Sequence, residues 1–214
     1  MKRKSRKTQP GATGCLDVGE RLRLVPYWER GIHKTDRLEI VLDPGPAFGI
    51  GDHPTTIIAL EYLEKAVHVI GSRPFSLLDV GTGTGVLALA GIAMGSHLTL
   101  GLDIDCASVY VARWNLKCNS PDRESSASFV VGGVECARGK FDIVTANLAA
   151  PTLLRIRDQL SACVGKVLVL SGIAEVMKEQ VLDVYSALGL VLKESDGRQE
   201  WNGALFVKAS DALL

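Results

Sequence analysis

Short apolar runs alternate with segments of helical periodicity from Pro74 onward, and this alternation restricts the fold more than any other feature of the chain. The runs are continuously hydrophobic, which is typical of strands that are buried on both faces. Strands that are joined through helices are parallel, because a parallel connection needs a long crossover. We expect strands at residues 75–80, 98–104, 128–131, 141–145 and 167–170, and helices at residues 86–94, 107–116, 151–162 and 174–188.

The end of the chain departs from this alternation. Two β-type runs, at residues 190–193 and 204–208, are separated by a polar turn around residues 196–202. A connection this short joins antiparallel strands. The predicted fold class is therefore α/β, with a Rossmann-like, doubly wound, mostly parallel seven-stranded sheet that contains one antiparallel strand. This is the layout of class I methyltransferases.

The segment ahead of the first strand is basic and then glycine-rich, without periodicity. We interpret residues 1–19 as a flexible lead-in and residues 20–210 as a single domain. Such a tail is usually solvated, and the alternative is an arm that touches RNA or an acidic partner. The basic cluster comprises Lys2, Arg3, Lys4, Arg6 and Lys7.

The domain begins with two short β-type runs at residues 22–28 and 37–42. Residues 43–56 are rich in glycine and proline, which excludes regular structure and predicts a long shaped loop. Pro54 suits the first turn of a helix, and the apolar spacing predicts that helix over residues 55–67.

The composition disfavours several classes of protein. Lysine plus arginine equals aspartate plus glutamate at 24 each, and no aromatic-rich patch is present, so nucleic-acid binding is disfavoured except through the basic tail. No apolar run approaches the roughly 18 residues of a membrane span. The five cysteines form no C-x-x-C pair, which predicts reduced, mostly buried thiols in a cytoplasmic protein without a metal site.

The strongest local motif is a glycine-rich turn, LDVGTGTG at residues 78–85. Gly81, Gly83 and Gly85 let a ligand approach the backbone closely at the carboxyl edge of the sheet. Asp103 ends the next predicted strand, 22 residues beyond Gly81 (103 minus 81), where its carboxylate can accept both hydroxyls of a ribose. The alternative for Asp103 is to cap the following helix, a role that suits Asp105 better.

Two cofactor classes use this geometry, and Asp79 distinguishes between them. Dinucleotide folds carry G-x-G-x-x-G and place a pyrophosphate at the helix N-terminus, whereas this chain has G-x-G-x-G. An acid beside the turn would repel a pyrophosphate but would suit the ammonium or sulfonium of S-adenosylmethionine. We therefore predict S-adenosylmethionine as the cofactor, with Asp79 as a contact. The alternative is that Asp79 only hydrogen-bonds the turn.

Two further side chains are candidates for the chemistry. Asn147 follows a predicted strand at the edge where the cofactor lies, and its amide can hold an amine without adding charge. It could instead cap the next helix. His53 lies in the proline- and glycine-rich loop and could accept a proton, although its position before Pro54 favours a structural role.

These motifs and the loop resemble a known family. The segments LDPGPAFGIGDHPTT (residues 42–56), LLDVGTGTGVLALA, GLDID, DIVTANLAAP and LVLSGI are similar, in order, to the catalytic domain of the ribosomal protein L11 methyltransferase family. The resemblance runs from about residue 22 to residue 208. It implies cofactor contacts at Thr56, Gly81, Asp103 and Asn147, and Thr56 is nominated by the resemblance alone.

Members of this family transfer methyl groups to amines of a large-subunit ribosomal protein, chiefly lysine side chains. The resemblance thus implies an S-adenosylmethionine-dependent N-methyltransferase with a ribosomal protein as substrate. The family also has an amino-terminal docking domain, whereas about twenty residues precede the first strand here, so the chain is either a fragment or has another target. The other possibilities are a methyltransferase of another protein, an RNA or a small molecule, and a non-catalytic protein that binds S-adenosylmethionine.

Overall fold

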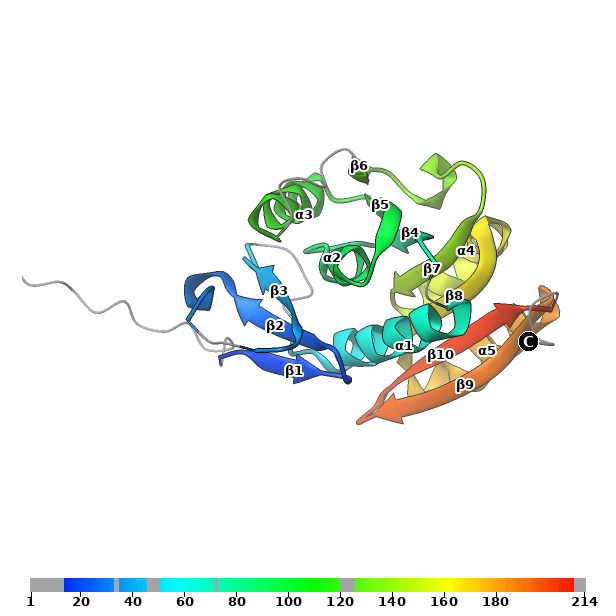
Figure 1. Ribbon diagram of the computed structural model, residues 1–214. Coiled ribbons are helices and arrows are strands. Elements are labelled where there is room, and N and C mark those ends of the chain that lie inside the picture. The colour runs from blue at the N-terminus through cyan, green and yellow to red at the C-terminus, as the bar shows by residue number, and fades with distance from the viewer. Residues whose placement is uncertain (1–13, 33–34, 46–50, 72, 120–125, 210–214) are drawn as a thin grey trace, which may run out of the picture.

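A seven-stranded sheet forms the centre of the computed structural model, which describes residues 14–32, 35–45, 51–71, 73–119 and 126–209 (Figure 1). The strand order is β6-β5-β4-β7-β8-β10-β9. Neighbouring strands are parallel except at β10, which is antiparallel to both β8 and β9. The predicted sheet with one antiparallel strand is confirmed. Its strands are β4 (Phe75–Val80), β5 (Ser96–Asp103), β6 (Ala127–Val131), β7 (Phe141–Asn147), β8 (Val164–Ala174), β9 (Leu190–Arg198) and β10 (Trp201–Lys208).

Helices cover both faces of this sheet, because successive side chains of a strand point to opposite sides. On β4, Leu77 packs into a core shared with α1 (Pro54–Ile70), α2 (Val86–Ala93) and α3 (Cys106–Asn119). The next residue, Leu78, packs into a second core shared with α4 (Ala150–Cys163) and α5 (Lys178–Ala187). Pro54 occupies the first turn of α1, as predicted.

Strand β8 is longer than the sequence predicts, and the helix after it is shorter. The apolar run predicts a strand at residues 167–170, but pairing with β10 continues as far as Ala174, which lies opposite Trp201. The helix predicted from residue 174 is therefore replaced at its start by a 3-10 turn at Glu175–Met177. Pairing between distant segments leaves no signal in a local apolar pattern.

A second, three-stranded sheet precedes α1. Strand β1 (Leu16–Val18) is antiparallel to β2 (Leu22–Pro26), and β3 (Leu38–Leu42) is parallel to β2. The prediction of a flexible lead-in up to residue 19 does not hold for β1, because backbone pairing with β2 orders those residues. Residues 1–13, with the basic cluster, lie outside the described residues. The run predicted at residues 22–28 ends as a strand at Pro26, and a 3-10 turn at Tyr27–Glu29 follows.

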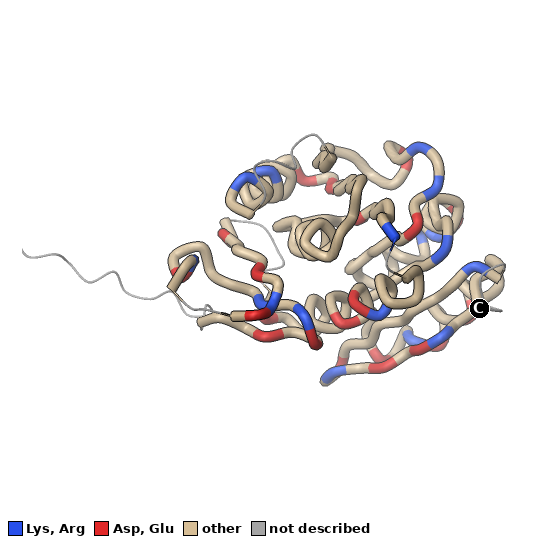
Figure 2. Tube along the Cα trace, in the orientation of Figure 1, with Lys and Arg blue, Asp and Glu red and all other residues tan. Residues whose placement is uncertain are grey.

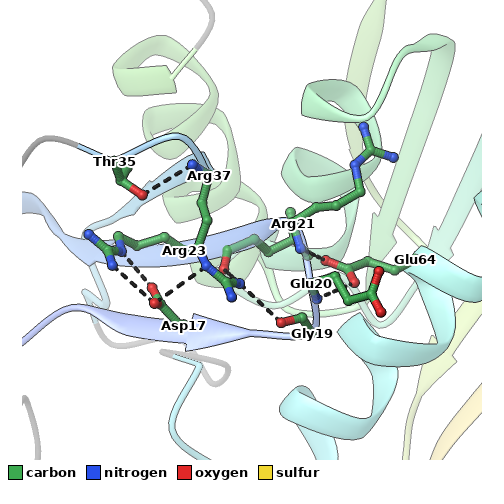
Figure 3. Close-up of polar contacts among 9 residues, drawn as sticks. Asp17, Gly19, Glu20, Arg21, Arg23, Thr35, Arg37 and Glu64 are labelled. Carbon is green, nitrogen blue, oxygen red and sulfur yellow. Dashed lines mark hydrogen bonds and ion pairs between the residues drawn. The ribbon is translucent and has the colours of Figure 1, made fainter.

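Polar contacts fix the small sheet against α1 (Figure 3). The Glu64 carboxylate on α1 accepts hydrogen bonds from the backbone amides of Glu20 and Arg21, at 2.9 and 3.0 Å. The Arg37 guanidinium donates to the carbonyl of Gly19 at 3.0 Å. The turn between β1 and β2 is thereby held on α1, so the small sheet and the large sheet share one core.

The surface carries both charges in alternation. Figure 2 shows lysine and arginine interspersed with aspartate and glutamate along the helices and strands. No helix in the described part of the chain is both long and apolar enough to cross a membrane. The predicted burial of the thiols is wrong for most of them: Cys163 is buried, Cys15 and Cys118 are partly exposed, and Cys106 and Cys136 are exposed because they lie at the start of α3 and in a 3-10 turn.

Candidate active site

A cavity of about 530 Å³ lies at the carboxyl ends of β4, β5, β6 and β7. Its volume falls within the range of small-molecule sites. Five of the predicted site residues line it, and they come from four separate parts of the chain because parallel strands end at a common edge. These residues are Thr56, Gly81, Gly83, Asp103 and Asn147. A larger hollow of about 920 Å³ lies at the amino edge of the sheet and contains none of the predicted residues.

The glycine-rich turn forms one wall of the cavity. Gly81 and Gly83 have φ angles of 75° and 53°, a left-handed region that a β-carbon disfavours. A β-carbon at Gly81 would also lie 2.4 Å from Cδ2 of Leu148, which is itself a lining residue. Gly85 shares the left-handed conformation at 83° but does not line the cavity: it is the N-cap of α2 and faces Ala112 of α3.

The backbone amides of this turn are used within the protein. Those of Gly81 and Thr82 donate to the Leu102 carbonyl at 2.8 and 2.9 Å. The amide of Gly83 donates to the Asp103 carboxylate at 2.9 Å. A pyrophosphate is held by such amides when they are free to face it. The hydrogen bonding of the turn therefore argues against the dinucleotide alternative.

Asp103 extends from the end of β5 into the same cavity. Its Oδ2 accepts from the Gly83 amide and its Oδ1 from the Asp105 amide, at 2.9 and 3.0 Å. A carboxylate has about four lone-pair sites, so the pair of oxygens can still accept two hydroxyls. The cap of α3 is Asp105, as expected: it accepts from the Ala107 amide and the Ser108 hydroxyl, and these bonds lower the pKa of its carboxyl.

Asp79 does not line the cavity. Its side chain is buried beneath the turn, where one oxygen accepts from the Thr82 hydroxyl at 2.7 Å and the other from the Thr145 hydroxyl at 2.8 Å. Burial raises the pKa of the Asp79 carboxyl to about 6, although both hydroxyls favour its charged form. The structure thus supports the alternative, in which Asp79 hydrogen-bonds the turn. The strand pattern correctly places Asp79 near the carboxyl edge of the sheet. It does not show that the side chain is buried beneath the turn instead of facing the cavity.

Asn147 and Thr56 meet at the cavity. Asn147 ends β7 and Thr56 lies in the first turn of α1, and Nδ2 of the former donates to Oγ1 of the latter at 3.5 Å. Asn147 does not cap α4, whose N-cap is Ala149 without a side-chain hydrogen bond. Within the described residues, Oδ1 of Asn147 accepts no hydrogen bond. This oxygen can therefore accept from an amine in the cavity.

His53 is placed as a helix cap. Its Nδ1 accepts from the Thr55 amide at 3.4 Å and lies 2.9 Å from the Thr55 hydroxyl, and its ring meets the edge of Trp201 with 5.5 Å between centroids. It is not among the residues that line the cavity. The structural role favoured by the sequence agrees with this position.

Several lining residues escaped the sequence reasoning. Gly132 and Gly133 follow β6 at the same edge, and the rule that selected Asp103 and Asn147 could have found them. Thr152 and Arg155 reach the cavity from α4, and no local pattern marks them. Among the described residues, no group of three histidine, cysteine or acidic side chains could hold a metal ion.

This chain is similar to known proteins over most of its length. The profile of the family "Ribosomal protein L11 methyltransferase (PrmA)" matches residues 15–209. A curated ribosomal protein L11 methyltransferase of Geobacter metallireducens is 39% identical over 191 residues, which is 88% of this chain and 61% of that protein. One of Pelobacter propionicus is 36% identical over 203 residues, 92% of this chain and 64% of that protein. The chain thus spans about six tenths of the length of these relatives.

Solved structures give the same picture. The ribosomal protein L11 methylase from Lactobacillus delbrueckii subsp. bulgaricus superposes with a TM-score of 0.81 at 27% identity, covering 92% of this chain and 99% of that chain. Magnesium protoporphyrin IX methyltransferase from Synechocystis, at a TM-score of 0.60 and 15% identity, covers 86% of this chain and 90% of its own and shares the fold alone. With the class I methyltransferase fold and a family match over nearly its whole length, the chain belongs to the ribosomal protein L11 methyltransferase family.

Proposed function

We propose that this chain is an S-adenosylmethionine-dependent methyltransferase that acts on a protein amine, a lysine of ribosomal protein L11. The observation that carries the proposal is the contact between Asn147 and Thr56 in the lining of a cavity that Gly81 and Asp103 also line. The printed names of the relatives supply the substrate.

The cavity fits the proposed cofactor in three respects. Gly81 and Gly83 form part of its wall without side chains, so a ligand can approach their backbone closely. The Asp103 carboxylate can still accept hydrogen bonds from two ribose hydroxyls. The amides of the turn donate to groups within the protein, so they are not available to a phosphate. Asp103 and Glu135 outnumber Arg155 among the charged residues of the lining, so its net charge is negative, which suits a cationic ligand. When bound, S-adenosylmethionine supplies an electrophilic methyl group on a sulfonium.

The residues of the chain would then orient the acceptor and keep it neutral. Oδ1 of Asn147 would accept a hydrogen bond from the substrate amine, while the bond from Nδ2 of Asn147 to the Thr56 hydroxyl holds the asparagine side chain in place. A lysine has a reference pKa of about 10.4, and desolvation in the cavity lowers it, so the neutral nucleophile forms without a strong base. Holding the amine in line with the methyl group supplies much of the rate enhancement. His53 keeps its role as the cap of α1.

The proposed substrate also indicates where the reaction takes place. A ribosomal protein is made and assembled in the cytoplasm, so we place the enzyme there. The basic segment at residues 1–13 lies outside the described residues, and an RNA target through that segment remains an outcome of the test below.

The test is incubation of the purified chain with methyl-labelled S-adenosylmethionine and purified ribosomal protein L11. Label on lysine, located by mass spectrometry, is the expected result. Label on another protein or on RNA in a ribosome-containing lysate, with none on L11, would overturn the substrate but keep the chemistry. Tight cofactor binding without transfer to any acceptor would identify a non-catalytic binding protein instead.

A further inference from the structure

Two asparagine side chains on α3 form hydrogen bonds with the backbone at the end of β3, as a neighbouring strand would do. Asn115 and Asn119 are four residues apart, so they lie on one face of the helix. The Asn119 side chain accepts from the Val41 amide and donates to the Val41 carbonyl, both at 2.7 Å. The Asn115 side chain likewise accepts from the Asp43 amide at 2.9 Å and donates to the Asp43 carbonyl at 3.1 Å. The first pair satisfies the outer edge of β3, the last strand of its sheet, and the second pair satisfies Asp43 just beyond the end of that strand.

Asn115 makes one contact that Asn119 lacks. Its Nδ2 also donates to the carbonyl of Thr84 at 3.0 Å, and its side chain is fully buried. Thr84 lies in the glycine-rich turn, between Gly83 and Gly85. The third bond of Asn119 goes to the carbonyl of Asn115, within its own helix, at 2.7 Å. The side-chain amide of Asn115 therefore links Asp43, just after β3, to the glycine-rich turn.

The turn needs such an anchor because its backbone has little rigidity of its own. Three of its residues are glycines in the left-handed region, and glycine restricts the chain least. Besides the backbone bonds of Gly81 and Thr82 to Leu102, two side chains hold its centre. Asp103 of β5 fixes the amide of Gly83, and Asn115 of α3 fixes the carbonyl of the adjacent Thr84.

We propose that Asn115 is a positioning residue, which holds the glycine-rich turn in its cofactor-binding shape through the Thr84 carbonyl. The inference rests on the proposed function, since it takes the turn to bind S-adenosylmethionine. Asn115 does not line the cavity and acts through Thr84. Loss of the Asn115 side chain should therefore weaken cofactor binding, and not only lower the stability of the protein.

The experiment compares Asn115→Ala with Asn119→Ala. Each substitution removes three hydrogen bonds, two of them to the backbone of Val41 in β3 or of Asp43 just after it, and only the first removes a bond to the turn. Calorimetric titration with S-adenosylhomocysteine should give a roughly tenfold weaker Kd for Asn115→Ala, the size expected for about one hydrogen bond, and a change under about twofold for Asn119→Ala. Thermal unfolding should show a loss of stability in both variants, and a larger one in Asn115→Ala because that side chain is fully buried whereas Asn119 is partly exposed. Equal affinities of the two variants would overturn the inference.

If Asn115→Ala does not fold, the inference can be tested by a measurement on the wild-type protein. Amide exchange followed by NMR should slow at Asp43 when S-adenosylhomocysteine binds, and slow less at Val41, because only Asp43 is joined through Asn115 to the turn. Equal responses at the two amides would contradict the inference. If the unaltered protein binds no S-adenosylhomocysteine, the proposed function itself fails, and this outcome is separate from a difference between the variants.

Discussion

Asn147 Nδ2 lies 3.5 Å from Thr56 Oγ1, although 91 residues separate the two in sequence. One residue ends a strand of the sheet and the other opens the helix that packs on it. This contact uses the Asn147 amide nitrogen, so the side-chain oxygen of Asn147 remains able to accept a hydrogen bond from an amine in the cavity.

Replacing Asn147 with alanine should lower kcat by roughly 100-fold or more, in the range seen when one catalytic hydrogen-bonding group is removed. The fold should survive, because Asn147 is half-buried and does not cap α4. The measurement is single-turnover methyl transfer to ribosomal protein L11, with circular dichroism as the check on folding. Thr56→Ser, which keeps the hydroxyl, is the matched control and should retain most activity. Unchanged turnover in Asn147→Ala would remove this residue from the site.

Asp103→Asn should weaken the binding of S-adenosylmethionine by roughly 10- to 100-fold, since the loss of a charged acceptor costs about 1.5–3 kcal/mol. The amide cannot accept on both sides as the carboxylate does. Asp105→Asn is the control: asparagine caps a helix about as well as aspartate and residue 105 does not line the cavity, so this variant should keep both the melting temperature and the affinity close to those of the wild type. Calorimetric titration of both variants decides the matter, and equal affinities would count against the ribose contact.

Gly81→Ala should weaken cofactor binding and also destabilise the protein. The left-handed φ of 75° costs roughly 1–2 kcal/mol for a residue with a β-carbon, and that atom would collide with Leu148. Gly139→Ala is the control, with a φ of 82° and no neighbour within 4 Å of the new β-carbon. Urea unfolding should show a loss in both variants, whereas titration should show a loss of affinity only in Gly81→Ala. A normal affinity in that variant would argue against close approach of the cofactor at this glycine.

The buried Asp79 should make stability depend on pH. Its pKa is about 6 in the folded protein and about 3.9 in the unfolded chain, so the folded state binds more protons between these values. This carboxyl therefore contributes stability below pH 4 that is lost as the pH rises through about 6, by about 3 kcal/mol at 1.36 kcal/mol per unit. Urea titrations from pH 4.5 to 7.5 should show about 2 kcal/mol of this fall in the wild-type protein relative to Asp79→Asn. Parallel pH profiles of the two proteins would contradict it.

His53→Asn should keep turnover within about threefold, because asparagine is also a good N-cap. His53→Ala should lose about 1 kcal/mol of stability with the cap. A general base at His53 predicts the opposite, because both variants would then be inactive. Single-turnover methyl transfer by His53→Asn distinguishes the two roles.

The agreement between sequence and structure is closest where neighbouring residues carry the signal. Strand β4 matches its predicted bounds, since its apolar run is delimited by Pro74 and the glycine-rich turn. Asp103 and Asn147 reach the cavity as predicted because each ends a strand at the common edge. The prediction fails for β1 and for the extension of β8, whose pairing partners lie elsewhere in the chain.

The sequence by itself determined the alternating architecture, the glycine-rich turn and the strand ends that line the cavity, because apolar periodicity and glycine act within a few residues of chain. Tertiary structure alone decided which side chains enter the cavity. It turned Asp79 inward to two threonines, brought Thr56 to Asn147, and set Asn115 between β3 and the turn. These contacts depend on strand order and on the packing of α1 and α3 against the sheet, which no local pattern records.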